Sequence, residues 1–225
     1  MGRVHSSHSA RLIVVGGHTR AVGKTSTIEH ILRARRGERW TAVKISAHRH
    51  AHADGSAPRV EEATEASPLT QTGRYLEAGA SRALLCRTPD TRLPETAALL
   101  QRLLAGGHRV IVESNRIVSL VHADVVLFLV APALDDWKLS SGACLTRADA
   151  LVSTGRSALV AAALAARGAG VDNRPVFRMD GDRRVHGLDA WLDARLARAR
   201  GTARAHTAMR VGAHPAASAV PHYEW

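Results

Sequence analysis

Short apolar runs alternate with segments of helical periodicity along most of the chain. Apolar runs predict strands, and apolar residues three and four positions apart predict helices. The predicted strands are Leu12–Val15, Thr41–Ile45, Ala83–Leu85, Val110–Val112, Val125–Val130, Ala150–Val152 and Pro175–Phe177. The predicted helices are Thr25–Arg36, Gly73–Ala78, Pro94–Leu104, Ser157–Arg167 and Leu188–Ala199. Several strand runs are apolar throughout, as a sheet covered on both faces requires. The pattern therefore predicts a three-layer α/β domain with a mostly parallel sheet.

Two segments fall outside this alternation. Residues 48–72 are polar and form a long connection between a strand and a helix, and such loops usually carry function. After about residue 200 the periodicity ends, and small residues, Arg and His follow. We predict an N-terminal extension over residues 1–10, one α/β domain over residues 11–200, and a disordered basic tail over residues 201–225.

The 225 residues carry a formal net charge of +11, with far more Arg than Lys. This charge suits an anionic partner, although an Ala- and Arg-rich composition also reflects a GC-rich genome. Cys86 and Cys144 have no metal-site or disulfide spacing, which favours a reducing, cytoplasmic setting. Residues 1–10 lack the apolar stretch of a signal peptide, and no apolar run approaches the length of a membrane span, so we expect no membrane association.

A glycine-containing turn joins the first predicted strand to the first predicted helix. Such a turn directs backbone N–H groups toward one point, where the helix dipole also favours negative charge. We expect Lys24 to be exposed and to reach terminal phosphates, and the Thr25 hydroxyl to ligate Mg²⁺. Five residues separate Gly17 from Gly23, whereas the common phosphate-loop signature has four. The alternative, an ordinary Gly-rich turn, would leave the adjacent Lys24-Thr25-Ser26 unexplained. The residues predicted to bind the nucleotide are Gly17, His18, Thr19, Arg20, Ala21, Val22, Gly23, Lys24, Thr25 and Ser26.

Polar residues at the ends of the predicted strands are further candidates, because ligands of open α/β sheets bind beyond the carboxyl ends of the strands. Glu113 is the best-placed carboxylate for Mg²⁺, and the alternative is an acid that caps the next turn. Asp54 is a second candidate ligand. Lys44 either holds a substrate or terminal phosphate, or is a solvated lysine at a strand end. We predict Lys24, Lys44 and Glu113 as catalytic residues, and Thr25, Glu113 and Asp54 as metal ligands.

Three histidines, His48, His50 and His52, follow the second predicted strand. Imidazoles suit Zn, Ni or Cu, but an alternating His segment is more often solvated or in contact with phosphate. Because no cysteine pair is nearby to complete a closed zinc site, we favour contact with a second ligand. No Asn-Lys-x-Asp motif identifies a guanine base, so GTP and ATP both stay candidates.

Two families resemble parts of this chain. The loop Gly17–Thr25 is similar to the phosphate loop of dethiobiotin synthetase and its relatives, which has the same five-residue spacing. In that resemblance Glu113 corresponds to the magnesium glutamate, and Lys44 to the lysine near the transferred phosphate. The middle of the chain more closely resembles the molybdopterin-guanine dinucleotide biosynthesis protein B family. There a Lys-His-x-His-His-Asp-like segment precedes a polar linker and a motif ending in Ala-Gly-Ala, and here Lys44, residues 48–54 and Arg74–Ala80 follow in the same order.

The second resemblance implies a P-loop NTPase that binds GTP or ATP with Mg²⁺, hydrolyses it weakly and assists molybdenum cofactor biosynthesis. Molybdopterin or its guanylyltransferase would be the partner. One rival is an ATP-dependent ligase or kinase of the dethiobiotin synthetase type, which would need a carboxylate or amine substrate between Lys44 and Glu113. A rival of another class is a basic nucleic-acid-binding module, but no RNA or DNA fold motif is present and the tail has few aromatic residues. A homodimer stays open.

Overall fold

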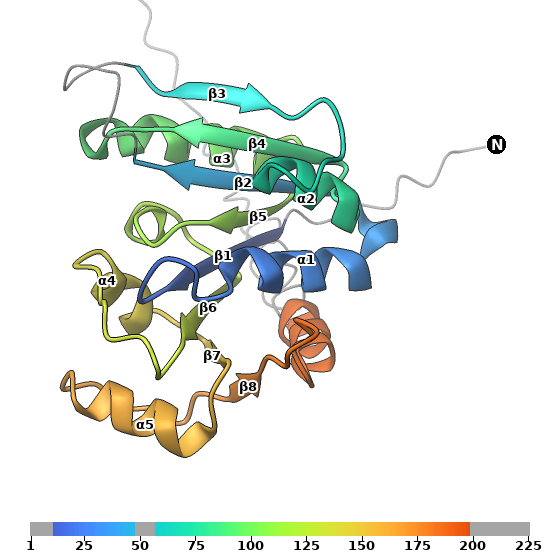
Figure 1. Cartoon of the computed structure of the whole chain (residues 1–225). Coiled ribbons are helices and arrows are strands. Elements are labelled where there is room, and N and C mark those ends of the chain that lie inside the picture. Colours follow the sequence, from blue (N-terminus) through green and yellow to red (C-terminus); the bar gives the residue numbers. More distant parts are fainter. Residues whose placement is uncertain (1–10, 48–56, 199–225) are drawn as a thin grey trace, which may run out of the picture.

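An eight-stranded sheet forms the centre of the computed structural model, which describes residues 11–47 and 57–198 (Figure 1). The strands are β1 (Arg11–Gly17), β2 (Trp40–Ser46), β3 (Arg59–Glu62), β4 (Arg82–Arg87), β5 (Arg109–Glu113), β6 (Val125–Val130), β7 (Ala150–Ser153) and β8 (Val176–Arg178). Their order is β3-β4-β2-β5-β1-β6-β7-β8. Neighbouring strands are parallel except for β3, which is antiparallel to β4.

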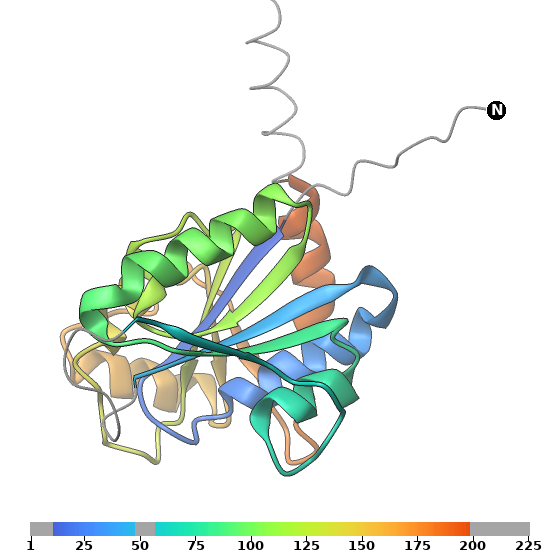
Figure 2. The same cartoon turned by 90° about the horizontal axis from the view of Figure 1, so that it is seen from above.

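Helices cover both faces of this sheet, and Figure 2 shows α1 and α3 on opposite sides of it. The helices are α1 (Lys24–Ala34), α2 (Gln71–Ala78), α3 (Leu93–Ala105), α4 (Ser141–Thr146) and α5 (Ser157–Ala165), followed by a helical segment of residues 188–198. Residues of β1 alternate between the two layers, since Ile13 and Val15 pack with α1 whereas Leu12 and Val14 pack with α3. The predicted three-layer α/β fold with a mostly parallel sheet is confirmed.

Because the central strands are parallel, their carboxyl ends all lie along the same side of the sheet. Glu113 of β5 lies between Val15 of β1 and Lys44 of β2 in the register of the sheet. Ligands of such sheets bind along this side, where the order of strands departs from the order of the sequence. The topology therefore brings Lys44 and Glu113 beside the turn that follows β1.

The polar connection that the sequence predicts over residues 48–72 contains two regular elements. Strand β3 lies within it, and α2 begins at Gln71. Strand β3 pairs only on one side and is mostly exposed, so it needs no apolar run and gives no sequence signal. The six-residue helix α4 was also not predicted, because it is too short for a clear period.

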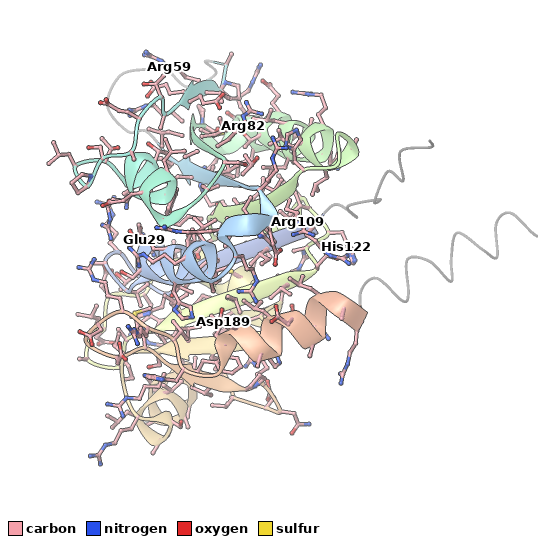
Figure 3. The ribbon with its side chains drawn as sticks, turned by 90° about the vertical axis from the view of Figure 1, so that its right-hand side faces the viewer. Glu29, Arg59, Arg82, Arg109, His122 and Asp189 are labelled. Carbon is pink, nitrogen blue, oxygen red and sulfur yellow. The ribbon has the colours of Figure 1, made fainter. Side chains whose placement is uncertain are left out.

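The segment of residues 188–198 packs on the same side of the sheet as α1. Leu188, Leu192 and Leu196 are buried in the core. The buried guanidinium of Arg35, at the end of α1, donates to Asp189 Oδ1 at 2.8 Å and to Asp193 Oδ1 at 2.7 Å (Figure 3 labels Asp189). The predicted last helix thus belongs to the folded unit, whereas the predicted extension of residues 1–10 and tail of residues 201–225 lie outside the described residues.

None of the helices in residues 11–47 and 57–198 is long and apolar enough to cross a bilayer.

Candidate functional site

The turn between β1 and α1 enters the helix through a glycine in a left-handed conformation. Gly23, which precedes α1, has φ 100°, a left-handed conformation that glycine adopts without strain. No side chain among the described residues caps the N-terminus of α1, and its first turn holds no acid. The N–H groups at this helix end are therefore left for a ligand, and the helix dipole favours a negative one.

Segments that follow β5 and β6 hold this loop in place. The Asn115 side chain forms a reciprocal pair with Gly17: its Oδ1 accepts from the Gly17 N–H at 2.8 Å, and its Nδ2 donates to the Gly17 oxygen at 2.8 Å. The Thr19 hydroxyl donates to Asp136 Oδ2 at 2.8 Å, and the Lys138 N–H donates to the His18 oxygen at 2.9 Å. The loop conformation thus depends on the strand ends on both sides of β1.

His18, which the sequence places among the nucleotide-binding residues, faces the protein. Its backbone N–H donates to the Leu129 oxygen at 3.1 Å. Its ring nitrogens lie 3.3 Å from the Leu129 oxygen and 3.1 Å from the Leu134 oxygen, and its ring is 4.6 Å from that of Trp137. Burial lowers the pKa of His18. The His18 side chain is therefore buried and supports the loop by its contacts with the segment that follows β6.

The carboxylate of Glu113 is the centre of a buried hydrogen-bond network. Lys44 Nζ donates to Oε1 at 2.6 Å, and the Thr25 hydroxyl donates to Oε2 at 2.9 Å. The hydroxyl of the fully buried Tyr75 also donates to Oε2. Burial raises the pKa of Glu113, but the charge of Lys44 and the hydrogen bonds from Lys44, Tyr75 and Thr25 outweigh that effect and hold the pKa below its usual value. Glu113 is therefore an ionised carboxylate next to the loop, and Lys44 is its ion-pair partner.

Only three of the 31 Lys and Arg residues in the sequence are lysines, and all three contribute positive charge to this site. Lys24 Nζ donates to the Thr19 oxygen at 2.6 Å. Burial, together with the charges of Lys138 and Lys44, lowers the pKa of Lys24 to about 8 despite the opposing effect of Glu113. Three ammonium groups around one carboxylate leave a positive excess, which suits a polyanion.

Lys24 differs from the sequence expectation in one respect. It is the first residue of α1 and is half-buried, whereas we expected an exposed loop residue. The loop folds back over the start of the helix, so that the ammonium group meets the Thr19 carbonyl and loses part of its hydration.

Thr25 and Glu113 offer oxygen atoms of the kind that could hold a Mg²⁺ ion. Magnesium prefers octahedral oxygen ligands at about 2.0–2.1 Å, so adjacent ligands lie about 2.9 Å apart. Thr25 Oγ1 and Glu113 Oε2, which share a hydrogen bond, are 2.9 Å apart, so an ion that replaced the hydroxyl proton between them would need only small movements. The described ranges hold no group of three or more His, Cys, Asp or Glu side chains that could bind a metal. Asp54, His48, His50 and His52 lie outside the described residues.

Helix α2 supplies two site residues that were not among the predicted ones. Tyr75 bonds to Glu113, and Gln71 Nε2 donates to Thr25 Oγ1 at 3.2 Å. Arg74, beside Tyr75, reaches back to the buried Glu29 of α1 at 2.6 Å and fixes the two helices together. The sequence signal for Tyr75 was its place in the Arg74–Ala80 motif, but nothing in the sequence connects it to Glu113.

Comparisons with known proteins give only distant similarity. No protein-family model matches the chain, and no curated protein matches it. Among solved structures, the chain is similar to HypB from Helicobacter pylori in complex with nickel, with 14% sequence identity, 77% of this chain and 80% of that chain covered, and a TM-score of 0.46. It is also similar to LpxK from Aquifex aeolicus in complex with ATP, with 16% identity, 75% and 53% covered, and a TM-score of 0.40. Similarity at this level assigns neither a ligand nor an activity, so the chemistry of the site is inferred from its own residues.

Proposed function

We propose that this protein binds a purine nucleoside triphosphate, GTP or ATP, together with Mg²⁺, and hydrolyses it weakly. The observation that carries the proposal is the convergence of Lys24, Lys44 and Lys138 on the loop before α1, beside the ionised Glu113. Lysine suits this place because its compact ammonium group binds phosphate oxygens as a point charge. The uncapped N-terminus of α1 adds backbone donors for the same phosphates.

Thr25 and Glu113 would hold the Mg²⁺ ion, which neutralises phosphate charge when it is bound. Glu113 would ligate the metal directly or through a water molecule. Lys24 would contact the terminal phosphates, and Lys44, one hydrogen bond from Glu113, lies where it could contact the same group. These roles follow from the observed carboxylate, hydroxyl and ammonium groups and their separations.

We further propose that the nucleotide serves molybdenum cofactor biosynthesis, with molybdopterin or its guanylyltransferase as partner. This assignment is supported by the order of Lys44, residues 48–54 and Arg74–Ala80 in the sequence. The ligase or kinase alternative places a substrate between Lys44 and Glu113. The 2.6 Å ion pair leaves no space there, so that alternative requires the pair to open.

Calorimetry with ATP and GTP, with and without Mg²⁺, tests the nucleotide site. The substitution Lys24→Ala should abolish measurable triphosphate binding and leave the melting temperature close to that of the wild type. The control Arg102→Ala removes an exposed charge on α3, on the opposite side of the sheet, and should bind like the wild type. Equal affinities for wild type and Lys24→Ala would contradict the proposal.

A second arm tests the pathway. Molybdopterin should raise the melting temperature of the protein loaded with its preferred nucleotide beyond the effect of the nucleotide alone. No added stabilisation by molybdopterin would remove the molybdenum assignment and leave the nucleotide site standing.

A further inference from the structure

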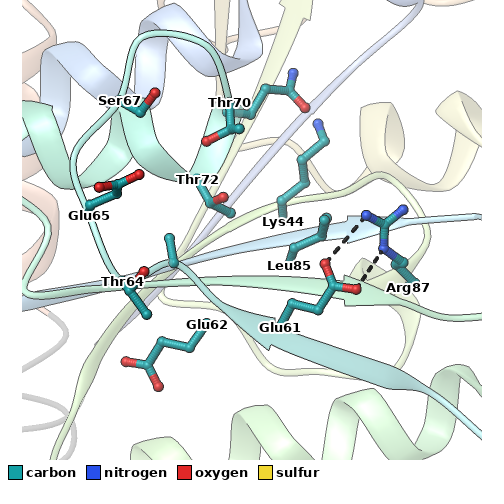
Figure 4. Close-up of a pocket in the computed structure, with 12 residues that line it drawn as sticks. Lys44, Glu61, Glu62, Thr64, Glu65, Ser67, Thr70, Thr72, Leu85 and Arg87 are labelled. Atoms are coloured by element: carbon teal, nitrogen blue, oxygen red, sulfur yellow. Dashed lines mark hydrogen bonds and ion pairs between the residues drawn. The ribbon is translucent and has the colours of Figure 1, made fainter.

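A cavity of about 350 Å³ opens next to the proposed nucleotide site, between the β3–β4 edge of the sheet and the start of α2 (Figure 4). Lys44 and Gln71 belong to its lining. Lys44 bonds to Glu113 at 2.6 Å, and Gln71 bonds to the Thr25 hydroxyl at 3.2 Å. A molecule in the cavity would therefore lie one side chain away from the residues proposed to hold Mg²⁺ and phosphate.

Among the described residues that line the cavity, both cations are already in ion pairs. Arg87 Nε lies 3.3 Å from Glu61 Oε1, and Lys44 is paired with Glu113. Glu62, also in the lining, has its own partner in Arg82 at 2.8 Å. An anionic ligand would have to break one of these ion pairs before it gained a cation.

Most of the unpaired polar atoms among the described lining residues are oxygen atoms that can accept hydrogen bonds. Within the described part of the chain, the exposed Glu65 carboxylate has no ion-pair partner, and the hydroxyls of the exposed Thr64 and the half-buried Thr72 make no hydrogen bond. In Figure 4, Thr72 and Lys44 lie between Glu65 on one side and the Glu61–Arg87 pair on the other. One unpaired carboxylate and two free hydroxyls suit a ligand that brings an ammonium group and hydroxyl groups.

We propose that this cavity binds a small hydroxylated amine, of the amino alcohol or amino sugar class, as the second ligand of the protein. Its ammonium group pairs with Glu65, and its hydroxyls bond to Thr64 and Thr72. The cavity volume is at the small end of the range for ligand sites, which sets the size of the molecule. The position of this ligand beside a terminal phosphate rests on the proposed function, whereas binding of the ligand to the cavity does not.

Three probes that differ in one terminal group test the chemistry: 3-amino-1,2-propanediol, glycerol and glycerate. Ligand-observed NMR should detect saturation transfer from the protein to the amine, and weaker or no transfer to the neutral and anionic probes. Glu65→Gln should weaken amine binding about fivefold, as the loss of one exposed ion pair of about 1 kcal/mol predicts. Thr72→Val, which removes a hydroxyl at constant volume, should weaken binding of the amine as well.

The control Glu77→Gln removes an exposed carboxylate of α2 that is not part of the lining, and should leave amine binding unchanged. Preference for glycerate, binding of no probe, or equal amine binding by wild type and Glu65→Gln would overturn the proposal. Triphosphate binding is measured on the same samples. A protein that binds nucleotide but not the amine refutes the cavity site alone, and one that binds the amine but not nucleotide refutes the proposed function alone.

Discussion

The ammonium group of Lys24 lies where the protein disfavours its charge. Burial is the main cause, and Lys138 and Lys44 add to it, so the pKa is lowered from 10.5 to about 8. A bound polyphosphate favours the charged form, and the site therefore takes up a proton on binding when the solution is above that pKa. In the free protein Lys24 is therefore mostly charged below pH 8 and loses its charge as the pH rises.

We expect triphosphate affinity to fall about tenfold between pH 7 and pH 9, because roughly one Lys24 side chain in ten is still protonated one pH unit above its pKa. Calorimetry at the two pH values measures the change. Lys24→Arg keeps its charge throughout this range and should show a much smaller fall. An equal fall in both proteins would assign the pH dependence to another group.

Substitution of Glu113 should distinguish the contribution of Mg²⁺ to triphosphate binding from that of the nucleotide alone. Glu113→Gln keeps the shape of the side chain but removes the negative charge, so Mg²⁺-dependent triphosphate binding should weaken by about tenfold or more. Binding without Mg²⁺ should change far less. The exposed acid of α3 provides the control Glu95→Gln, which should alter neither measurement. Equal losses with and without the metal would identify Glu113 as a structural acid.

At the scale of elements, the loop before α1 is held by the ends of β5 and β6 more than by its own residues. Asn115 satisfies both backbone groups of Gly17, each at 2.8 Å. Asn115→Ala should therefore lower the free energy of unfolding by about 1–3 kcal/mol, since it leaves partly buried polar groups unpaired. It should also weaken nucleotide binding, because the loop loses its anchor.

Denaturant unfolding measures this cost. Asn173→Ala, at an exposed position after α5, is the matched control and should be neutral. Unchanged stability of Asn115→Ala would show that the anchor is not needed.

The sequence predicted those elements whose burial leaves a regular apolar pattern. Val125–Val130 is buried at every position and matches β6 in both bounds. Strand β3 has the sequence Arg59-Val60-Glu61-Glu62 and lies at the edge, where pairing with β4 defines it and burial does not. The site follows the same rule, because Lys24, Thr25 and Glu113 have local signals. The Tyr75–Glu113 bond joins residues far apart in the sequence and follows only from tertiary packing.

At the scale of the whole molecule, the helical segment of residues 188–198 completes the helical layer that contains α1. We expect a chain that ends at residue 200 to keep the melting temperature and nucleotide affinity of the full chain. A chain that ends at residue 186 loses the buried Leu188, Leu192 and Leu196, about 5 kcal/mol or more of burial, which is comparable to the stability of a small domain. It also leaves the buried Arg35 without Asp189 and Asp193.

Thermal unfolding of the two shortened chains checks this expectation. Loss of nucleotide binding in the chain that ends at residue 200 would show that the segment beyond it belongs to the functional unit.

The central position of β1 in the sheet determines how late the newly made chain can complete the pairing around this strand. Its neighbours are β5 and β6, and the registers pair Leu12 with Val110 and Ile13 with Val125. A nascent chain that has reached only α3 contains the whole loop proposed to bind phosphate but neither of the strands that flank β1. Pairings so distant along the chain form late and slowly. A nucleotide at the proposed site would therefore not guide early folding, and it would stabilise the protein only after translation has passed β6.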